Sequence, residues 1–333
     1  MNTTNVQLQE YNKFLSTIKK QYYVNECFHE DTNCSQIIRA HSIQNNRILK
    51  KISDNGDVLY PRIKIGDSGT IVLLEREGRK KATTFTGFCK YHDNFLFTPI
   101  EHGDYKKGDK EQEFLFAYRA FAKEYHAEKV SINSFNSILE ESIESIELTQ
   151  QYRQFFQHLK NNREKVLSGL VPIKKSFNDA IKEKNFDIIH TRSFEFFEEY
   201  HLAASSVLTI ENDLQGGIIN DFTKINENIK YYRFLYLTVF PQEGKTYILL
   251  SFLKKDKKAF SSLMNQIQKS SLQRKKVIIS NILAINAENL AVSPKKWCQM
   301  SESQKLQFID LFEETSFQEG DSMTRLKNVN LFI

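Results

Sequence analysis

Three of the four cysteines and three of the eight histidines lie in two short stretches, ECFHEDTNCSQIIRAHSIQ and GFCKYHDNFLFTPIE. Cys89 and His92 are separated by two residues, so one turn can present both side chains to a single ion. Cys27 and Cys34 are separated by six residues, which requires a wider turn, and the polar HEDTN between them is suited to one. The pattern predicts a structural Zn²⁺ site with Cys27, Cys34, Cys89 and His92 as ligands.

Other sets of ligands are also compatible with the sequence. His29 can replace Cys27, and His41 can replace one member of the set. Alternatively, the three cysteines are small core residues and His92 lies on the surface, since free cysteine is commonly buried. We favour the metal site because chance would not readily gather three of four cysteines around a Cys-x-x-His pair.

Four cysteines in 333 residues make no disulfide framework, and cysteines grouped with histidine in a reducing compartment are more typical of metal binding. A small β-rich module would depend on its ion for stability, so zinc binding would contribute to folding. The remaining cysteine, Cys298, is expected to be a half-buried helix residue.

The bulk composition is that of a globular protein, with 40% hydrophobic and 26% charged residues. The net charge of +5 is distributed over groups such as REGRKK, LKKDKK and QRKK, which permits nucleic-acid binding without requiring it. No run of eighteen apolar residues and no secretory signal are present, so we expect a cytoplasmic protein with no membrane partner.

Short β-prone segments joined by turn signals follow the first cysteine pair. They are DVLYPRIKI, TIVLLEREG, KATTFTGFC and NFLFTPIE. A β-ribbon that has one ligand pair before it and a second pair opening a helix, here near Asp93, is the treble-clef arrangement. Ahead of this module, residues 6–22 have the apolar spacing of a short amphipathic helix.

The rest of the chain alternates between helical and strand patterns. Helical spacing predicts helices over 111–129, 142–168, 172–184, 256–269, 271–285 and 301–315. The stretches FEFFEEYHLAASSVLTI, YYRFLYLTVFP and KTYILLSFL predict an antiparallel sheet, with PQEGK as a tight hairpin turn. We expect an α+β fold in three parts: a treble-clef-like zinc module over 1–103, a helical segment over 104–186, and an α+β domain with an antiparallel sheet over 187–333.

Several blocks of the sequence resemble those of a family of uncharacterised bacterial proteins. The blocks IIRAHSIQ, FCKYHDNFLFTPIE and EQEFLFAYRAFAKE carry the resemblance in the first half. HLAASSVLTIENDLQG and AENLAVSPKKW are similar to later blocks of that family, so the resemblance extends from about Cys27 to Trp297. It implies a shared architecture.

The zinc motif more distantly resembles that of HNH endonucleases, which place one histidine after the first zinc knuckle and another just after the second. The resemblance implies that His41 is the general base that activates water, and that Asp93 helps to hold Mg²⁺ or Mn²⁺. The position before the base, usually a metal ligand, is Ala40. Alternatively, His41 is a ribbon residue that hydrogen-bonds a neighbour or a zinc-bound thiolate.

Three classes of function follow. The first is a zinc-stabilised component that binds nucleic acid or partner proteins from the same operon, in the bacterial antiviral defence setting that the HNH-like resemblance implies. The second is an HNH-like, metal-dependent nuclease that hydrolyses phosphodiesters with His41 as base. The third is a regulatory protein whose C-terminal sheet senses a ligand.

Overall fold

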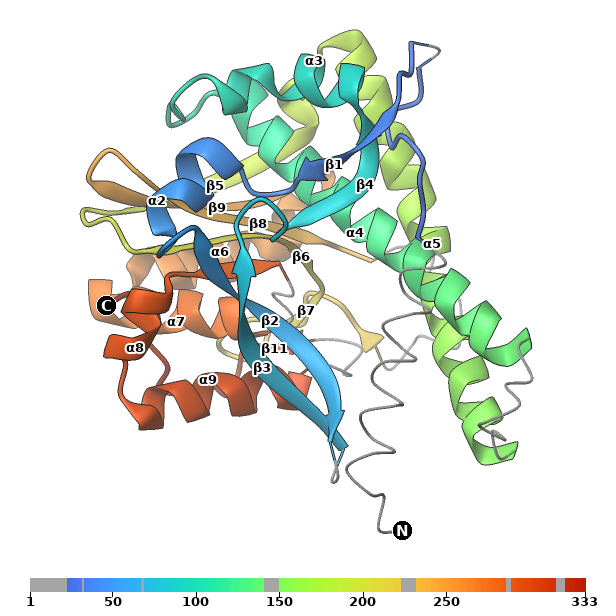
Figure 1. Ribbon diagram of the computed structural model, residues 1–333. Helices are drawn as coiled ribbons and strands as arrows, with labels where there is room; N and C mark the ends of the chain where they lie inside the picture. Colours follow the sequence, from blue (N-terminus) through green and yellow to red (C-terminus); the bar gives the residue numbers. More distant parts are fainter. Residues whose placement is uncertain are drawn as a thin grey trace.

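In the part of the chain that the structure describes, a seven-stranded antiparallel sheet carries helices on both faces (Figure 1). The computed structural model describes residues 23–31, 33–66, 69–140, 150–222, 232–285, 289–315 and 321–333. This arrangement confirms the predicted α+β class and the antiparallel sheet. The helix predicted over 6–22 lies outside the described residues.

Every neighbouring pair of strands in this sheet is antiparallel. From one edge to the other the strands are β3 (Gly69–Gly78), β2 (Asp57–Gly66), β10 (Leu290–Val292), β6 (Leu202–Leu208), β8 (Leu235–Gln242), β9 (Lys245–Leu253) and β5 (Ile189–Phe196). The predicted hairpin turn joins β8 to β9. Its residues Glu243 and Gly244 have φ angles of 49° and 76°, as a two-residue type I′ turn requires.

The helices belong to two regions of the chain. The first region contains α2 (Lys50–Ile52), preceded by a π-helical turn (Asn45–Leu49), then α3 (Lys90–Glu101), α4 (Lys110–Glu140) and α5 (Gln150–Glu183). The second contains α6 (Lys257–Lys269), α7 (Leu272–Ala284), α8 (Pro294–Gln299) and α9 (Glu302–Thr315). Short 3-10 turns precede β5 (Phe186–Ile188) and α6 (Lys254–Asp256). The predictions for α6, α7 and α9 are confirmed, whereas Cys298 in α8 is exposed and not half-buried.

Alternate residues of the central strands enter two different hydrophobic cores. Leu235 and Leu237 of β8 belong to the core that α6, α7 and α9 complete. Tyr236 and Phe240 of the same strand belong to the core that α3, α4 and α5 complete. Because helices cover both faces, β6, β8 and β9 are buried almost throughout and lack the polar alternation of a half-exposed sheet.

The predicted break between helices at residues 168–172 is wrong, because α5 runs through it with Pro172 inside the helix. Proline removes one helical hydrogen bond and usually ends or kinks a helix. Here Leu170 and Ile173, on either side of the proline, are both buried in the core shared with α4. Burial on both sides of Pro172 keeps α5 continuous.

The strand predicted for NFLFTPIE is also wrong, and the alternative of a helix near Asp93 is the better one. The segment belongs to α3, which begins earlier, at Lys90. Leu96, Phe97 and Ile100 are buried on one side of this helix, which is the spacing of a helix that packs against a core.

Two smaller pairs of strands complete the description. β1 (Ile37–His41) pairs with β4 (Thr84–Cys89), and β7 (Ile210–Asn212) pairs in parallel with β11 (Asp321–Ser322). Between β1 and β4 the chain passes through α2 and the hairpin β2–β3, which lies in the large sheet. The treble-clef arrangement therefore stays a prediction.

The division of the chain into three parts also stays a prediction. β2 and β3, from the first part, extend the sheet that the third part mainly forms, through pairing of Leu59 with Val292. None of the helices in the described part of the chain combines the length and the hydrophobicity that a membrane span requires.

Candidate metal centre

Two segments that are distant in the sequence lie side by side at the start of α3. Antiparallel pairing of β1 with β4 brings the chain before β1 next to the end of β4. The backbone N–H of Phe28 donates to the carbonyl of Gly87 at 2.7 Å, which fastens the preceding loop to the same strand. These contacts place the loop with the first two cysteines against Cys89, the last residue of β4.

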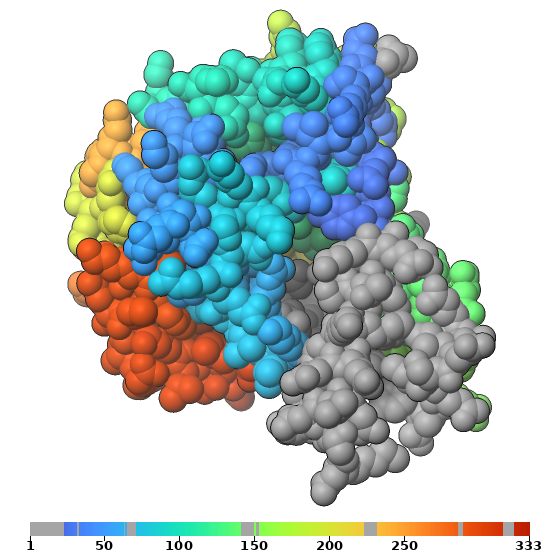
Figure 2. Space-filling view, viewed as in Figure 1, coloured from blue at the N-terminus to red at the C-terminus, as the bar shows by residue number. Residues whose placement is uncertain are grey.

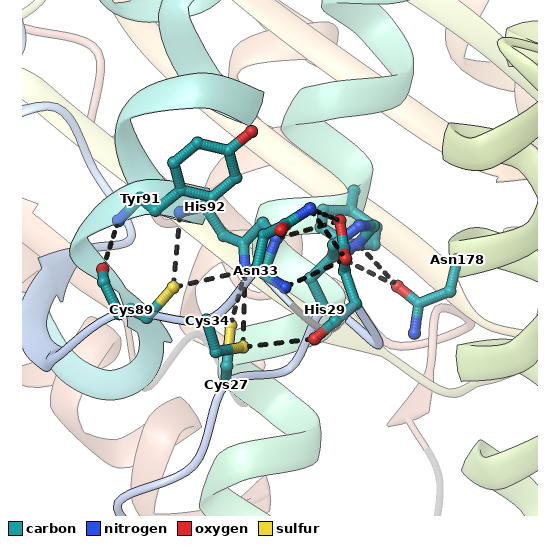
Figure 3. Close-up of polar contacts among 11 residues, drawn as sticks. Cys27, His29, Asn33, Cys34, Cys89, Tyr91, His92 and Asn178 are labelled. Atoms are coloured by element: carbon teal, nitrogen blue, oxygen red, sulfur yellow. Dashed lines mark hydrogen bonds and ion pairs between the residues drawn. The ribbon is translucent and has the colours of Figure 1, made fainter.

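Three thiols surround one ring nitrogen of His92 (Figure 3). The Nδ1 atom lies 3.4 Å from Sγ of Cys27, 3.6 Å from Sγ of Cys34 and 3.2 Å from Sγ of Cys89. All four donor atoms lie within 4.8 Å of one another, and the three cysteines are free thiols. Cys27, Cys34, Cys89 and His92 therefore lie close enough to hold one metal ion.

The distances from the ring nitrogen to the three sulfur atoms are compatible with a tetrahedral ion between them. With bonds of about 2.3 Å to sulfur and about 2.0 Å to nitrogen, a tetrahedral zinc ion would separate sulfur from nitrogen by about 3.5 Å. The three measured distances from His92 Nδ1, between 3.2 and 3.6 Å, are close to this value. Only small movements of the side chains would be needed to admit an ion.

Cys89 is the N-cap of α3 and is fully buried. Burial by itself would raise the pKa of its thiol, but hydrogen bonds from the backbone N–H groups of His92 and Ser35 outweigh it and lower the pKa to about 6. For Cys27 the effect of burial outweighs the backbone hydrogen bonds from Cys89 and His29, and it raises the pKa of the thiol to about 12. Cys89 is therefore the thiol that is most easily ionised before an ion is bound.

A second group of donors, His29, Asp31 and His92, lies on the other side of the His92 ring. The ring of His29 contacts that of His92 edge-on, with centroids 4.6 Å apart. Its Nδ1 atom is 3.2 Å from the Tyr118 hydroxyl and 3.3 Å from Oδ1 of Asn178. The structure thus groups Cys27 with the other thiols, and His29 with Asp31.

His41 lies at the end of β1 and belongs to neither group of donors. Its Nε2 atom is 3.2 Å from the backbone carbonyl of Arg79. Since a carbonyl oxygen only accepts hydrogen bonds, this nitrogen carries the proton and donates. Burial lowers the pKa of His41, which favours the neutral ring.

Asp93 follows His92 in α3 and is also absent from both groups. Burial raises the pKa of its carboxyl group, and one of its oxygens is buried with no hydrogen-bond partner among the described residues. The ion pair between Arg119 and Glu101, 2.6 Å long, acts electrostatically on both Asp93 and His41. Among the described residues, neither Asp93 nor His41 belongs to a group of three or more metal-binding donors.

The exposed side of α3 carries a pair of aromatic rings next to the metal ligands. Tyr91 and Phe95 are 44% and 65% exposed, and their rings stack with centroids 5.7 Å apart and planes inclined by 5°. They line a shallow hollow together with Ser35, Lys90 and Asn94. In the space-filling view, α3 and the loop before β1 share one end of the molecule (Figure 2).

The sequence interpretation missed this aromatic pair and the position of Asp31. Tyr91 and Phe95 are four residues apart, which is a helical contact spacing, but the predicted strand NFLFTPIE includes Phe95. The sequence alone predicts only a turn residue at Asp31, between Cys27 and Cys34. Its position between those ligands, two residues from His29, is the signal that was available.

Comparisons with known proteins find no relative of this chain. No known protein family, no curated protein and no solved structure matches the chain. The resemblances to an uncharacterised bacterial family and to HNH endonucleases therefore stay predictions.

Proposed function

We propose that the protein binds one Zn²⁺ ion through Cys27, Cys34, Cys89 and His92, and that this ion stabilises a surface that binds nucleic acid or a partner protein. The observation that carries the proposal is the grouping of three thiols around the Nδ1 atom of His92. Zinc suits this set because thiolate and imidazole donors in a tetrahedral arrangement are its usual structural ligands.

The number of donors supports a structural and not a catalytic ion. Catalytic zinc sites leave one position for water or substrate, whereas four protein ligands fill a tetrahedral site. Two of the ligands, Cys89 and His92, are 0% and 1% exposed, which limits access of water from their side. An ion at this position would join the loop before β1, the end of β4 and the first turn of α3.

The exposed side of α3 supports a binding role. Tyr91 and Phe95 are too exposed to contribute much to the core, and aromatic residues are enriched where proteins bind partners. The exposed residues of this helix are Lys90, Tyr91, Asn94, Phe95 and Thr98, so the face carries a lysine and no carboxylate. Aromatic rings beside a cation can also stack on nucleic-acid bases.

Metal analysis tests the zinc site. The purified protein is expected to contain one zinc ion per chain, and Cys89→Ser is expected to lose it together with thermal stability, because binding and folding are coupled. Cys298→Ser is the matched control, since this exposed thiol lies outside the group and its substitution should leave the zinc content unchanged. A wild-type protein without bound metal would overturn the proposal.

Binding of labelled single-stranded and double-stranded oligonucleotides at several salt concentrations tests the surface. Tyr91→Ala with Phe95→Ala should weaken binding, while Phe197→Ala, which removes a ring that is 82% exposed elsewhere, should not. Salt-dependent binding that is lost in the double variant supports nucleic acid. An absence of binding at low salt leaves a partner protein as the proposed ligand.

A metal-dependent nuclease with His41 as base and Asp93 as a ligand of Mg²⁺ or Mn²⁺ is the second candidate, and it rests on the resemblance of the zinc motif to that of HNH endonucleases. It predicts cleavage of plasmid DNA or RNA with Mg²⁺ or Mn²⁺ that disappears in His41→Ala while zinc content is retained. Equal cleavage by wild type and variant would contradict it. The defence setting and the ligand-sensing alternative stay predictions.

A further inference from the structure

The Nε2 atom of His92 is a buried polar atom that has no hydrogen-bond partner in the described part of the chain. His92 is 1% exposed, and its other nitrogen, Nδ1, faces the three thiols. A potential hydrogen-bond acceptor for Nε2 is Oδ2 of Asp31, which lies 3.6 Å away. A slight rotation of the ring or of the carboxylate would bring the two atoms to hydrogen-bond distance.

Metal binding through Nδ1 determines the protonation state of Nε2. A neutral imidazole that gives the lone pair of one nitrogen to a metal carries its proton on the other. Nε2 would then be a buried N–H donor, and such donors are rarely left without an acceptor. A carboxylate in this position fixes the ring orientation and makes the ligating nitrogen more basic.

We propose that Asp31 is the positioning residue of the metal centre, accepting a hydrogen bond from Nε2–H of His92 while Nδ1 binds the ion. The inference rests on the zinc site of the proposed function. It also gives a reason for the wide spacing between Cys27 and Cys34, because the residues between them supply this acceptor.

The loop is built to hold the Asp31 carboxylate in place. Its Oδ1 atom accepts from the backbone N–H of Asn33 at 3.1 Å, and the Asn33 side-chain amide lies 3.2 Å from Oδ1 and 3.4 Å from Oδ2. These contacts restrain Asp31 while its Oδ2 atom lies 3.6 Å from Nε2 of His92.

A second ion held by His29, Asp31 and His92 is the competing interpretation. It would require the His92 ring to lose both protons and to bridge two ions. It would also place the second ion next to His29, whose Nδ1 already contacts Tyr118 and Asn178. One hydrogen bond to Asp31 satisfies Nε2 without an additional ion, so we assign Asp31 as an acceptor.

Zinc affinity measured by competition with a chromophoric chelator tests the assignment in the full-length protein. Asp31→Asn keeps an oxygen for the turn at Asn33 but removes the charge, and is expected to weaken zinc binding by about 10-fold. Asp31→Ala removes the acceptor and is expected to weaken it by up to about 100-fold. Glu30→Gln is the matched control, because this adjacent carboxylate pairs with Lys174 and should not alter affinity.

An NMR signature separates positioning of the ring from general damage to the loop. In the zinc-loaded protein, the proton on Nε2 of His92 should be observable and shifted downfield by its carboxylate acceptor. The resonance should move upfield in Asp31→Asn and stay in place in Glu30→Gln.

The results of these experiments separate a failure of the Asp31 assignment from a failure of the proposed zinc site. A wild-type protein that binds no zinc overturns both proposals. A zinc-loaded protein whose affinity and His92 resonance are the same in Asp31→Asn overturns the positioning role alone, and a second equivalent of tightly bound zinc would also overturn it.

Discussion

At the scale of single residues, a hydrogen bond from His126 of α4 connects this helix to the start of the described chain. The Nε2 atom of His126 donates to the carbonyl of Val24 at 2.9 Å and lies 3.2 Å from the Thr86 hydroxyl. The ring is 6% exposed, and burial, together with the nearby Lys123, lowers its pKa from 6.5 to about 4. The folded protein therefore keeps His126 neutral in mild acid.

This burial predicts a loss of stability in acid. Between pH 6.5 and about 4 the unfolded chain protonates His126 while the folded chain does not, so the free energy of unfolding falls as the pH falls through this window. The total effect is about 3 kcal/mol. In urea unfolding, the free energy of unfolding should differ less between pH 7 and pH 4.5 for His126→Gln than for wild type. Equal pH dependence in both proteins would contradict the prediction.

The candidate ligands could be predicted at this scale because their chemistry is local. The Cys-x-x-His spacing of Cys89 and His92 indicates a shared ion without knowledge of the fold. Asp31 could not be recognised in the same way, because its role depends on which ring nitrogen of His92 faces the thiols. The loop that contains Asp31 is brought against Cys89 by the pairing of β1 with β4, which the sequence does not display.

At the scale of elements, α5 contains a proline where an ordinary helix residue would be expected. Pro172 is exposed, and the helix continues on both sides of it. Replacing it with alanine would restore a helical hydrogen bond, although the unfolded chain would gain freedom. We expect Pro172→Ala to stabilise the protein by about 1–2 kcal/mol in thermal or chemical unfolding.

Val171→Ala is the control for this change, since it alters the neighbouring exposed side chain and keeps the proline. It should change stability by less than about 0.5 kcal/mol. A destabilised Pro172→Ala would show that α5 requires a proline at this position.

The elements that could be predicted are those with clear periodicity. The hairpin β8–β9 and the helices α6, α7 and α9 lie close to their predicted positions, because their apolar patterns are long and bounded by turn residues. The α3 segment was misjudged as a strand, since NFLFTPIE is rich in β-prone residues and contains Pro99. Its capping by Cys89 and its buried side, with Leu96 and Phe97, override this local preference.

At the scale of the whole molecule, the candidate metal site and the large sheet are joined through one hydrophobic core. Phe28, located between two candidate ligands, contacts Tyr118 and Phe121 of α4 edge-on. The same core includes Tyr236 of β8. Pairing of β2 with β10 links residues more than 230 positions apart, and no local signal announces such a contact.

The position of the candidate site predicts which segments respond to removal of the ion. Chelation should increase hydrogen exchange in the loop before β1, in β4 and in α3, because an ion would join these segments. The strands β8 and β9, which are buried between two helical layers, should exchange as before. A uniform increase over the chain would show that the ion supports the whole fold, and no increase would show that it supports none of it.

X-ray absorption spectroscopy at the zinc edge is the sharpest test of the proposed zinc site, because it reports both the ion and its ligands in the purified protein. We expect one zinc ion per chain, bound by three sulfur atoms at about 2.3 Å and one imidazole nitrogen at about 2.0 Å. A chain that holds no zinc, or a zinc ion bound mainly by oxygen, would contradict it.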